Sequence, residues 1–423
     1  MKKVAIIGLG YVGLPLALRF VRAGVAALGL DIDAVKCTRL NAGESYIKHV
    51  PATAVAEARQ SGRLEASTDF ARIREVEAIL ICVPTPLDAH HEPDMSHVFR
   101  TGESLAPHLQ RGQLVVLEST TYPGTTDTDL RKILETGSGL LAGKDFHLAF
   151  SPEREDPGNP ACDAARVPKV VGGLTSACRD RAVACYTHVT DQVVPVSSCR
   201  VAEAAKLLEN IFRAVNIALV NELKVVYTAM GIDVWEVIEA AKTKPFGFMP
   251  FYPGPGLGGH CIPIDPHYLA WKAREFGQNT RFIELAAEIN EAMPALVAAK
   301  VADVLNGEGT ALRGARILLL GLAYKPNVDD DRESPAYALM RLLENKGAQV
   351  SYHDPNVPVI RPTREYPEFA GRQAAALAPT GHDLALLVTA HDDYRRHDFS
   401  SWKIPLVDTR NCVAHRPERY YRA

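Results

Sequence analysis

Residues 4–13 read VAIIGLGYVG, and residues 14–31 read LPLALRFVRAGVAALGLD. The short apolar run Val4–Gly8 is typical of a buried strand, and a second such run lies at Ala26–Asp31. Between them, Leu14–Ala23 has the apolar spacing of a helix. A strand, a glycine-rich loop, a helix and a second strand make up the first unit of a parallel α/β sheet.

The loop between this strand and helix follows the pattern Gly-x-Gly-x-x-Gly. Gly8 allows a tight turn, Gly10 lets a pyrophosphate approach the backbone, and Gly13 lets the helix pack closely on the strand. The start of the helix adds free N–H groups and a positive dipole. In a plainer interpretation the glycines serve only the turn. We expect the loop to bind a dinucleotide through Gly8, Gly10, Tyr11, Val12 and Gly13.

Asp31 ends the second strand, 18 residues after Gly13. A carboxylate at this place accepts hydrogen bonds from the ribose hydroxyls and repels a 2′-phosphate. Lys36 and Arg39 are the only nearby cations in the sequence that would favour a phosphate. The sequence therefore predicts NAD, rather than NADP, as the cofactor.

The rest of the chain alternates between sheet-like and helical patterns. Apolar runs separated by helical stretches extend the first sheet at residues 78–83, 114–118 and 146–150. After a change of pattern near residues 194–198, Ala202–Ala229 contains neither Gly nor Pro and is predicted to be one long helix. More helix is predicted at residues 234–241 and 266–304. A second strand–helix–strand unit is predicted at 315–320, 335–345 and 349–353, with later strands at 383–389 and 405–408.

These patterns predict an α/β protein with two Rossmann-like, doubly wound parallel-sheet domains joined by a central helical region with one long helix. The predicted boundaries are 1–195 for the first α/β domain, 196–305 for the helical region and 306–423 for the second α/β domain. A chain of 423 residues is long enough for two or three domains, each with its own core.

The overall composition excludes several classes of protein. With 47 Lys and Arg against 50 Asp and Glu, the chain is not expected to coat nucleic acid or bind a membrane through basic residues. Its eight Cys form no CxxC pair and are too sparse for a disulfide scaffold. We expect reduced thiols, a cytoplasmic location and no metal site.

The first 18 residues superficially resemble a signal peptide, because two lysines precede an apolar stretch. Three glycines interrupt that stretch, and the dinucleotide loop explains their spacing better. No run approaches the roughly 18 uninterrupted apolar residues of a spanning helix, so a soluble protein without a membrane segment is expected.

Residues 245–266 contain six Pro and five Gly and are predicted to be neither helix nor central strand. A long loop of this kind in a compact domain is usually functional. A thiol at Cys261, after two flexible glycines, can be approached closely by a ligand, and Asp265 lies four residues on. Most single cysteines are inert, but this setting favours a nucleophile. His260 is a poor candidate for its base, because adjacent side chains seldom point at one another.

Lys206 and Asn210 lie four residues apart on the predicted long helix and therefore share a face. Glu203 and Glu209 allow a plainer interpretation, in which the lysine forms a solvated surface ion pair. Other polar stretches follow likely strands, at the sheet edge where ligands bind in α/β proteins. These are Ser119-Thr120, Ser151-Pro152-Glu153-Arg154, Tyr324-Lys325 and Asp331-Arg332-Glu333-Ser334.

Together these motifs resemble the UDP-glucose/GDP-mannose dehydrogenase family over nearly the whole chain. The longer strings SPEREDPGN (151–159) and KPFGFMPFYPGPGLGGHCIPIDP (244–266) are most similar to UDP-N-acetylglucosamine 6-dehydrogenases, which supply acetamido-uronic acids for bacterial surface polysaccharide. The matching motifs are GLGYVGLP (8–15), VPTP (83–86), EST (118–120), SPER (151–154), the Lys206–Asn210 helix, GGHCIPIDP (258–266) and GLAYKPNVDDDRES (321–334).

The resemblance implies a four-electron oxidation of a primary alcohol at sugar C6 to a carboxylate, with two NAD and one water. It implies that Cys261 captures the aldehyde as a thiohemiacetal and then carries a thioester that water cleaves. Lys206 and Asn210 would stabilise the developing oxyanion. Glu153 would position or deprotonate water and Asp265 would assist proton transfer, although the base in each step can be Glu153, Asp265 or a water.

The resemblance also assigns binding roles. Domain 1–195 would bind NAD and domain 306–423 the UDP-sugar. Further NAD contacts would come from Pro84, Thr85, Thr120 and Arg332. Contacts to the nucleotide sugar would come from Glu153, Arg154, Lys206, Asn210, Gly258, Lys325 and Arg410.

Two features depart from the UDP-glucose members of the family. The motif around Arg410 differs from theirs. They also carry an arginine upstream of the cysteine that reaches a neighbouring subunit's ligand, whereas residues 243–247 read TKPFG here. Lys244 or Arg281 are alternative substitutes for that arginine, and the sequence does not choose between them.

Several alternatives remain open. Within the family, the substrate can be UDP-glucose, UDP-N-acetylgalactosamine, UDP-N-acetylmannosamine or GDP-mannose. A β-hydroxyacid dehydrogenase would need neither the cysteine nor the C-terminal domain, and a nonenzymatic NAD-binding regulator would not need Cys261, Lys206, Asn210 and Glu153. The long helix, apolar on one side, suits the core of a homodimer or a higher homo-oligomer.

Overall fold

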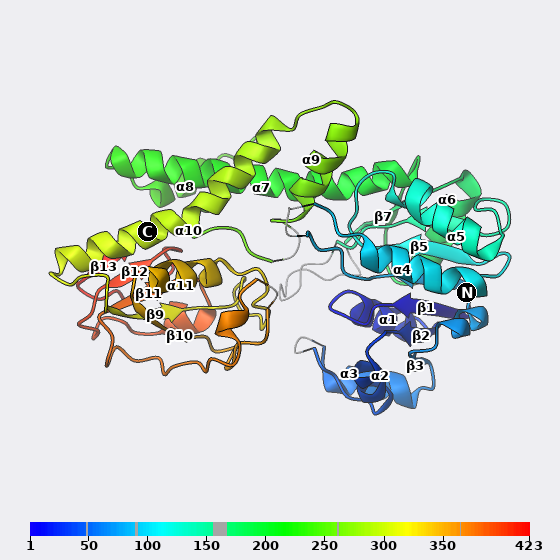
Figure 1. The fold of residues 1–423 in the computed structure, drawn as a ribbon, viewed down its shortest axis with the longest axis horizontal. Coiled ribbons are helices and arrows are strands. Elements are labelled where there is room, and N and C mark those ends of the chain that lie inside the picture. The colour runs from blue at the N-terminus through cyan, green and yellow to red at the C-terminus, as the bar shows by residue number, and fades with distance from the viewer. Residues whose placement is uncertain (48–49, 89–91, 155–166, 260–261, 364) are drawn as a thin grey trace. The chain divides into compact units, whose positions relative to one another are not determined.

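The computed structural model describes residues 1–423 except 48–49, 89–91, 155–166, 260–261 and 364 (Figure 1). The chain separates into two compact units, the first comprising Met1–Glu209 with His267–Asn279 and the second Asn210–Pro266 with Thr280–Ala423. Each unit contains its own β-sheet with helices packed on it, which confirms the predicted α/β class. Among the described residues, no helix combines the length and apolar character needed to cross a membrane.

The sheet of the first unit has the strand order β3-β2-β1-β4-β5-β6-β7-β8. Strands β1 to β6 run parallel, β7 is antiparallel to β6, and β8 is parallel to β7. The strands are β1 (Lys3–Ile7), β2 (Ala26–Leu30), β3 (Leu64–Ser67), β4 (Ala78–Ile81), β5 (Leu114–Leu117), β6 (His147–Phe150), β7 (Lys169–Gly173) and β8 (Val193–Val196).

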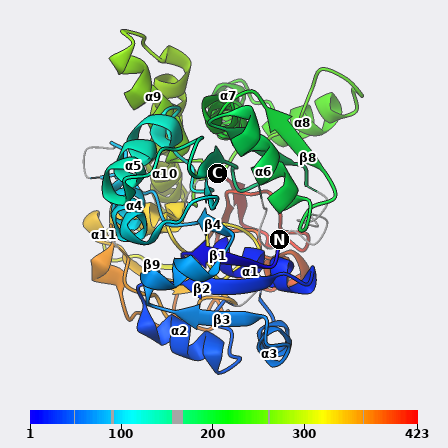
Figure 2. The same cartoon turned by 90° about the vertical axis from the view of Figure 1, so that its right-hand side faces the viewer.

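Helices cover both faces of this sheet. Figure 2 shows α4 and α5 on one side and α6 on the other. One core cluster joins Ala182 and Tyr186 of α6 with Leu16 and Phe20 of α1, against Val4 of β1 and its neighbours. The helices are α1 (Gly13–Arg22), α2 (Ala34–Asn41), α3 (Ala52–Gln60), α4 (Ser96–Leu105), α5 (Arg131–Ser138) and α6 (Ser176–Tyr186), with shorter turns at Phe70–Glu75, Ala106–His108 and Thr125–Leu130.

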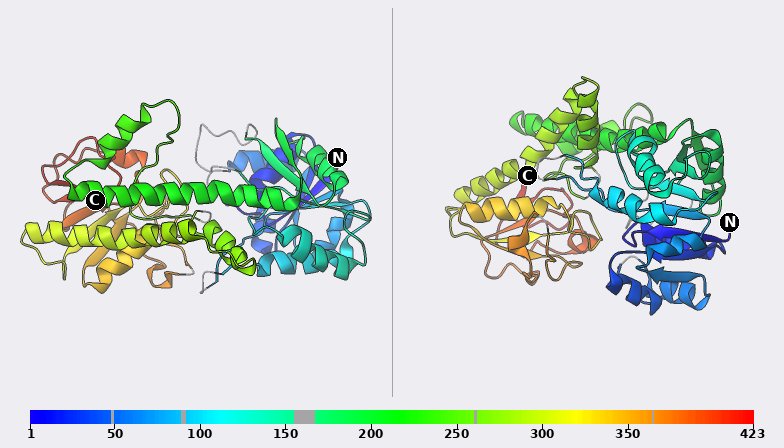
Figure 3. Two further views of the ribbon diagram at one scale, coloured as in Figure 1. Left: turned by 90° about the horizontal axis from the view of Figure 1, so that it is seen from above. Right: turned by 45° about the vertical axis from the view of Figure 1, so that its right-hand side comes forward.

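The long central helix is present as expected. Helix α7 runs unbroken over Cys199–Ala229, as Figure 3 shows. The Nδ2 of Asn221 on α7 donates to the Oδ1 of Asn290 on α10, 2.9 Å away, and the Nδ2 of Asn290 donates to the carbonyl of Ala214 at 3.1 Å. These buried amides fasten α10 to α7. The remaining central helices are α8 (Val234–Lys242), α9 (Asp265–Glu275) and α10 (Arg281–Gly307).

The sheet of the second unit is parallel throughout, with the order β10-β9-β11-β12-β13. Alternate residues of β9 enter two cores: Ile317 and Leu319 pack with α10 and α11, and Leu318 and Leu320 face the opposite core. The elements are β9 (Arg316–Leu320), α11 (Pro335–Asn345), β10 (Gln349–His353), a turn at Pro367–Phe369, β11 (Leu384–Leu387), α12 (Asp392–Arg396), β12 (Leu406–Asp408) and β13 (Tyr420–Arg422).

One predicted helix is wrong. We expected a single helix over residues 266–304, but α9 ends at Glu275 and α10 begins at Arg281. Gly277 has φ +68°, its N–H bonds the carbonyl of Arg274, and the next N–H returns to Ala273. This glycine cap ends a helix because the left-handed conformation is easy only for glycine.

Other differences are smaller. No apolar pattern predicted the short strands β3, β7 and β13, and β8 begins one residue before the predicted change of pattern. Residues 245–266 were predicted to contain neither helix nor strand. This holds for the described part of 245–264, but α9 already begins at Asp265. The domain boundaries at 195 and 305 remain predictions, because the division into two units cuts the chain elsewhere.

The three loop glycines have different surroundings. A Cβ on Gly8, whose φ is +87°, would lie 2.6 Å from the carbonyl oxygen of Cys82. A Cβ on Gly13 would lie 1.9 Å from the carbonyl oxygen of Gly8. A Cβ on Gly10 would have no described atom within 4 Å. Two of the glycines therefore serve packing, and Gly10 leaves open space.

We predict that Gly13→Ala lowers the free energy of unfolding by about 3 kcal/mol, because a methyl group there overlaps a backbone oxygen. Gly10→Ala is the matched control and should leave stability almost unchanged. Thermal and urea unfolding of both variants measures the difference. Equal stability of the two variants would contradict the packing role of Gly13.

Candidate active site

The carboxyl ends of β1, β4 and β5 are neighbours in the first sheet and carry most of the predicted NAD contacts. Gly8–Gly13 follows β1, Pro84 and Thr85 follow β4, and Thr120 follows β5. The hydroxyl of Ser119 donates to the carbonyl of Val83 at 2.7 Å and links the last two loops. Helix α1 begins at Gly13 without a side-chain cap, and the N–H of Leu14 in its first turn donates to the carbonyl of Gly10 at 3.1 Å.

Asp31 is held at this edge by the glycine loop itself. Its carboxylate is 6% exposed and accepts hydrogen bonds from the N–H groups of Leu9 (2.9 Å) and Asp33 (3.0 Å). The ammonium of Lys36 lies 3.4 Å from it, and Arg39 bonds Glu44 and the carbonyl of Ser45. Both nearby cations are therefore engaged, and the carboxylate is placed for ribose hydroxyls, which fits NAD.

Lys206 is not the solvated ion pair of the plainer interpretation. Its side chain is buried, and its Nζ donates to the backbone carbonyl of Glu153 at 2.6 Å, with the Glu153 carboxylate 4.0 Å away. Glu203 is buried and accepts hydrogen bonds from the backbone N–H groups of Gly124 and Thr126. Glu209 pairs with Arg154 at 2.8 Å. Lys206 is thus held away from water beside the end of β6.

Burial raises the pKa of the Glu153 carboxyl group, and the charges of Lys206 and Lys169 oppose this effect. A buried carboxyl group with a raised pKa is a candidate for proton transfer. Glu153 and Lys206 are therefore brought together as the sequence predicted, with charges that influence each other.

Near Glu153, three polar side chains, Glu118, Lys169 and Tyr186, form a cluster that no sequence pattern indicated. Glu118, at the end of β5, is 1% exposed and forms a 2.5 Å ion pair with Lys169, and its other oxygen accepts from the hydroxyl of Tyr186. Glu118 is part of the EST string, but Lys169 starts β7, which no pattern predicted. Such pairings of charged residues 51 positions apart leave no local sequence signal.

Asn210 and Asp265 meet within the second unit. Both are buried, and the Nδ2 of Asn210 donates to the Oδ2 of Asp265. Asp265 is the first residue of α9, and Asn210 lies one helical turn after Lys206 on the continuous helix α7. This hydrogen bond holds the Asn210 amide in one orientation.

Cys261 and His260 lie outside the described residues, so their predicted roles are untested. The two glycines before them are closely packed: a Cβ on Gly258 would lie 2.9 Å from the Cβ of Tyr324, and a Cβ on Gly259 would lie 2.7 Å from the Tyr324 ring. The glycine pair is needed because the loop passes directly over this tyrosine.

The other cysteines within the described residues are partly or fully buried. Burial raises the pKa of Cys185 and of Cys412 to about 12, and it also raises the pKa values of Cys37, Cys82 and Cys199. These groups are neutral thiols at physiological pH and poor nucleophiles. In the described parts of the chain, no three His, Cys, Asp or Glu side chains gather as metal ligands would.

The predicted contacts of the second sheet also lie at its carboxyl edge. Lys325 and Arg332 belong to the loop after β9, and Arg332 forms a two-point ion pair with Asp330 at 2.6 and 2.7 Å. Arg410 follows β12, and its Nε donates to the carbonyl of Val388 at 2.9 Å. Its guanidinium lies against Gly254, where a Cβ would have no room.

The surroundings of Arg410 are rich in positive charge. Burial, together with the charges of Arg410 and Lys300, lowers the pKa of Lys224 to about 8.

Of the substitutes considered for the missing arginine, Lys244 stacks over the ring of Phe246 and Arg281 begins α10.

Comparisons with known proteins agree with this geometry. Three models of the UDP-glucose/GDP-mannose dehydrogenase family match the chain: the NAD binding domain at residues 2–190, the central domain at 200–292 and the UDP binding domain at 318–415. The UDP-N-acetyl-D-glucosamine 6-dehydrogenase of Pseudomonas aeruginosa is 35% identical over 400 residues, covering 93% of this chain and 91% of that protein.

A second relative, the UDP-N-acetyl-D-mannosamine dehydrogenase of Escherichia coli K12, is 37% identical over 370 residues, 85% of each chain. Among solved structures, the UDP-D-ManNAc dehydrogenase from Pyrococcus horikoshii superposes with a TM-score of 0.90 at 31% identity, covering 100% of this chain and 99% of that one. The chain belongs to the UDP-glucose/GDP-mannose dehydrogenase family and is an NAD-dependent nucleotide-sugar dehydrogenase.

Proposed function

We propose that the protein oxidises C6 of a UDP-N-acetylhexosamine, with UDP-N-acetylglucosamine as the first candidate, to the corresponding uronic acid. The buried ammonium of Lys206 beside Glu153 carries this proposal, because a cation kept out of water is suited to stabilising an alkoxide or oxyanion. The Pseudomonas aeruginosa relative bears the name of this activity. UDP-N-acetylmannosamine is the second candidate, because relatives of similar identity are named for it.

The reaction removes four electrons and needs a nucleophile that retains the aldehyde. NAD, held by the glycine loop and Asp31, would supply the hydride acceptor for each of the two oxidations. In our proposal, the thiol of Cys261 adds to the aldehyde and forms a thiohemiacetal. Loss of a hydride and a proton turns this adduct into a thioester, and attack by water then releases the carboxylate and the free thiol.

The remaining groups handle charge and protons. Lys206 and Asn210 stabilise the negative oxygen at C6, and the bond to Asp265 orients the Asn210 amide. Glu153, whose pKa is raised by burial, positions or deprotonates the attacking water. Asp265 and a second water remain the alternative bases.

The uronic acid product is proposed to serve bacterial surface polysaccharide, such as lipopolysaccharide O-antigen, in the cytoplasm. The glycine loop, Asp31, Pro84, Thr85, Thr120 and Arg332 would hold NAD in this reaction. The nucleotide sugar would contact Arg154, Gly258, Lys325 and Arg410 besides the reacting groups.

We predict that a panel of UDP- and GDP-sugars with NAD will show oxidation of UDP-N-acetylglucosamine with two NADH formed for each sugar consumed. Absorbance at the NADH band gives the stoichiometry.

Cys261→Ser should lose the complete reaction and still bind NAD. A variant that turns over normally would remove the thiol from the mechanism, and faster oxidation of UDP-N-acetylmannosamine would reverse the order of the two substrates.

We predict that Lys206→Ala lowers kcat by about 10²- to 10³-fold and leaves the Kd of NAD nearly unchanged, because the oxyanion loses its cation. Lys144→Ala is the matched control, since Lys144 is an exposed lysine in the same unit. Steady-state kinetics and calorimetry separate the two effects. Equal losses of turnover and NAD affinity would indicate a role in folding instead.

We also propose that α7 forms the core of a homodimer. Leu208, Phe212, Leu219 and Val226 are exposed on α7, and their spacing places them on one face of the helix. The opposite face carries Lys206 and Asn210, which are buried. A contiguous apolar face of this kind is typical of a protein interface.

We predict that Leu219→Glu, at a position that is 52% exposed, converts the protein to monomers in sedimentation or light-scattering measurements. Leu141→Glu places the same charge on an exposed leucine outside α7 and should leave the assembly unchanged. Dissociation by both variants, or by neither, would argue against an interface on α7.

A further inference from the structure

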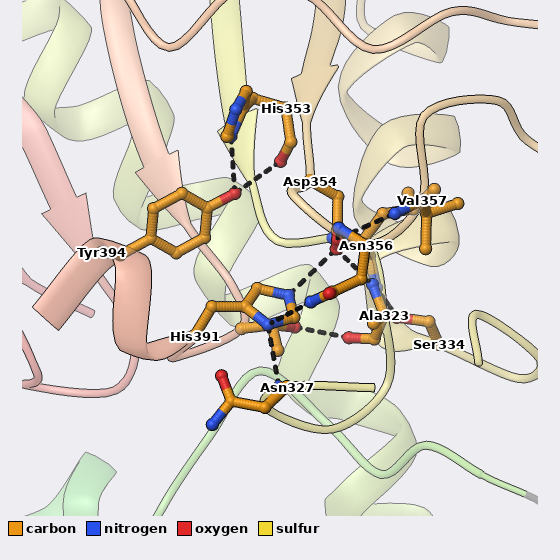
Figure 4. Close-up of polar contacts among 12 residues, drawn as sticks. Ala323, Asn327, Ser334, His353, Asp354, Asn356, Val357, His391 and Tyr394 are labelled. Atoms are coloured by element: carbon orange, nitrogen blue, oxygen red, sulfur yellow. Dashed lines mark hydrogen bonds and ion pairs between the residues drawn. The ribbon is translucent and has the colours of Figure 1, made fainter. Parts of the chain in front are cut away.

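His391 and Asp354 form a buried pair at the carboxyl edge of the second sheet (Figure 4). His391 lies shortly after β11 and Asp354 directly after β10, and both side chains are fully excluded from solvent. The Nε2 of His391 is 3.0 Å from the Oδ2 of Asp354, and its Nδ1 accepts a hydrogen bond from the backbone N–H of Asn327 at 2.9 Å. Because that N–H is a donor, Nδ1 carries no proton, so Nε2–H donates to Asp354.

The pair holds the loop at residues 321–334 at two places. The Oδ2 of Asp354 also accepts from the N–H groups of Leu322 and Ala323, at 2.7 and 2.9 Å. His391 holds the same loop at Asn327. Lys325 lies between the two attachment points. Its backbone is therefore fixed from both sides by one pair of side chains.

Two non-glycine residues of this loop have a positive φ. Asn327 has φ +63° and Glu333 has φ +51°, both in the left-handed region that non-glycine residues rarely occupy. The Oδ1 of Asn327 accepts from the N–H of Asp392, so the residue is tied to the His391 segment twice. Strained backbone persists where surrounding contacts determine it, and such positions cluster at ligand sites.

The same loop supports the segment before Cys261. Tyr324, next to Lys325, packs against Gly258 and Gly259. The N–H of Tyr324 donates to the carbonyl of Asp330 at 3.0 Å, which closes the loop on itself. Movement at Asn327 would therefore reach both the lysine and the glycine pair.

We propose that His391 is a positioning residue, which through Asn327 and Asp354 holds loop 321–334 in the shape that presents Lys325 to the diphosphate of the nucleotide sugar. This inference rests on the proposed function, since it takes Lys325 as a contact to the substrate. A positioned cation binds phosphate more tightly because less ordering remains to be done on binding.

Two substitutions separate the contacts of the two ring nitrogens of His391. Besides the N–H of Asn327, the Nδ2 of Asn356 lies 3.3 Å from Nδ1. In His391→Asn the amide oxygen replaces Nδ1 as the acceptor for Asn327, and the bond to Asp354 is lost. In His391→Gln the amide nitrogen can replace Nε2–H toward Asp354, and the acceptor for Asn327 is lost. His382→Gln is the control, because His382 contacts Ser351 in the same unit, before β11 and away from the loop.

We expect His391→Gln to raise the Kd of UDP, measured by calorimetry on the full chain, and the KM of the nucleotide sugar by about tenfold, because losing the bond to Asn327 leaves the loop less ordered before UDP binds. The Kd of NAD should stay unchanged, and His391→Asn should retain most of the UDP affinity. Thermal unfolding of all three variants reports any loss of folding.

Equal weakening of UDP binding in His391→Gln, His391→Asn and His382→Gln would overturn the proposal, as would parallel losses of UDP and NAD affinity. A wild-type protein that oxidises none of the UDP-sugars yet binds UDP in a His391-dependent way would contradict the proposed function alone. Oxidation of a UDP-sugar with an unchanged KM in His391→Gln would contradict this inference alone.

Discussion

The exclusion of water from one ammonium group is the constraint on which the rest of the first unit depends. Lys206 is buried, its Nζ donates to the Glu153 carbonyl, and the Glu153 carboxyl group lies 4.0 Å away. Burying a charge is costly unless it is paired and hydrogen-bonded, so the surrounding elements must be rigid. Helix α7 is fixed near Lys206 by Glu203, which accepts hydrogen bonds from the Gly124 and Thr126 N–H groups.

Much of the fold could be predicted from the sequence because its signals are local. The glycine loop, the strand that ends at Asp31 and the uninterrupted helix α7 each follow from residues close together in the chain. The break between α9 and α10 was missed, because a single glycine in a helical pattern is often tolerated and Gly277 acts as a cap only through its φ of +68°. Strands β3 (LEAS), β7 (KVVGG) and β13 (YYR) were missed because polar residues or glycines interrupt their apolar residues.

The candidate site divides in the same way. Residues at strand ends, such as Glu153, Thr120 and Lys325, could be placed because ligands bind at that edge of α/β sheets. The Glu118–Lys169 ion pair and the His391–Asp354 pair could not be placed, since each joins residues from different strands far apart in the chain. The burial of Lys206 and Glu203 could not be predicted either, because on a helix the same residues could equally form exposed ion pairs.

The raised pKa values of the buried cysteines have a consequence for chemical labelling. An electrophilic reagent reacts with the thiolate form, and burial suppresses this form at Cys37, Cys82, Cys185, Cys199 and Cys412. These five cysteines are therefore expected to react slowly with such a reagent. A mild alkylating probe at neutral pH would bypass these five positions, so any stoichiometric adduct would report on a thiol elsewhere in the chain.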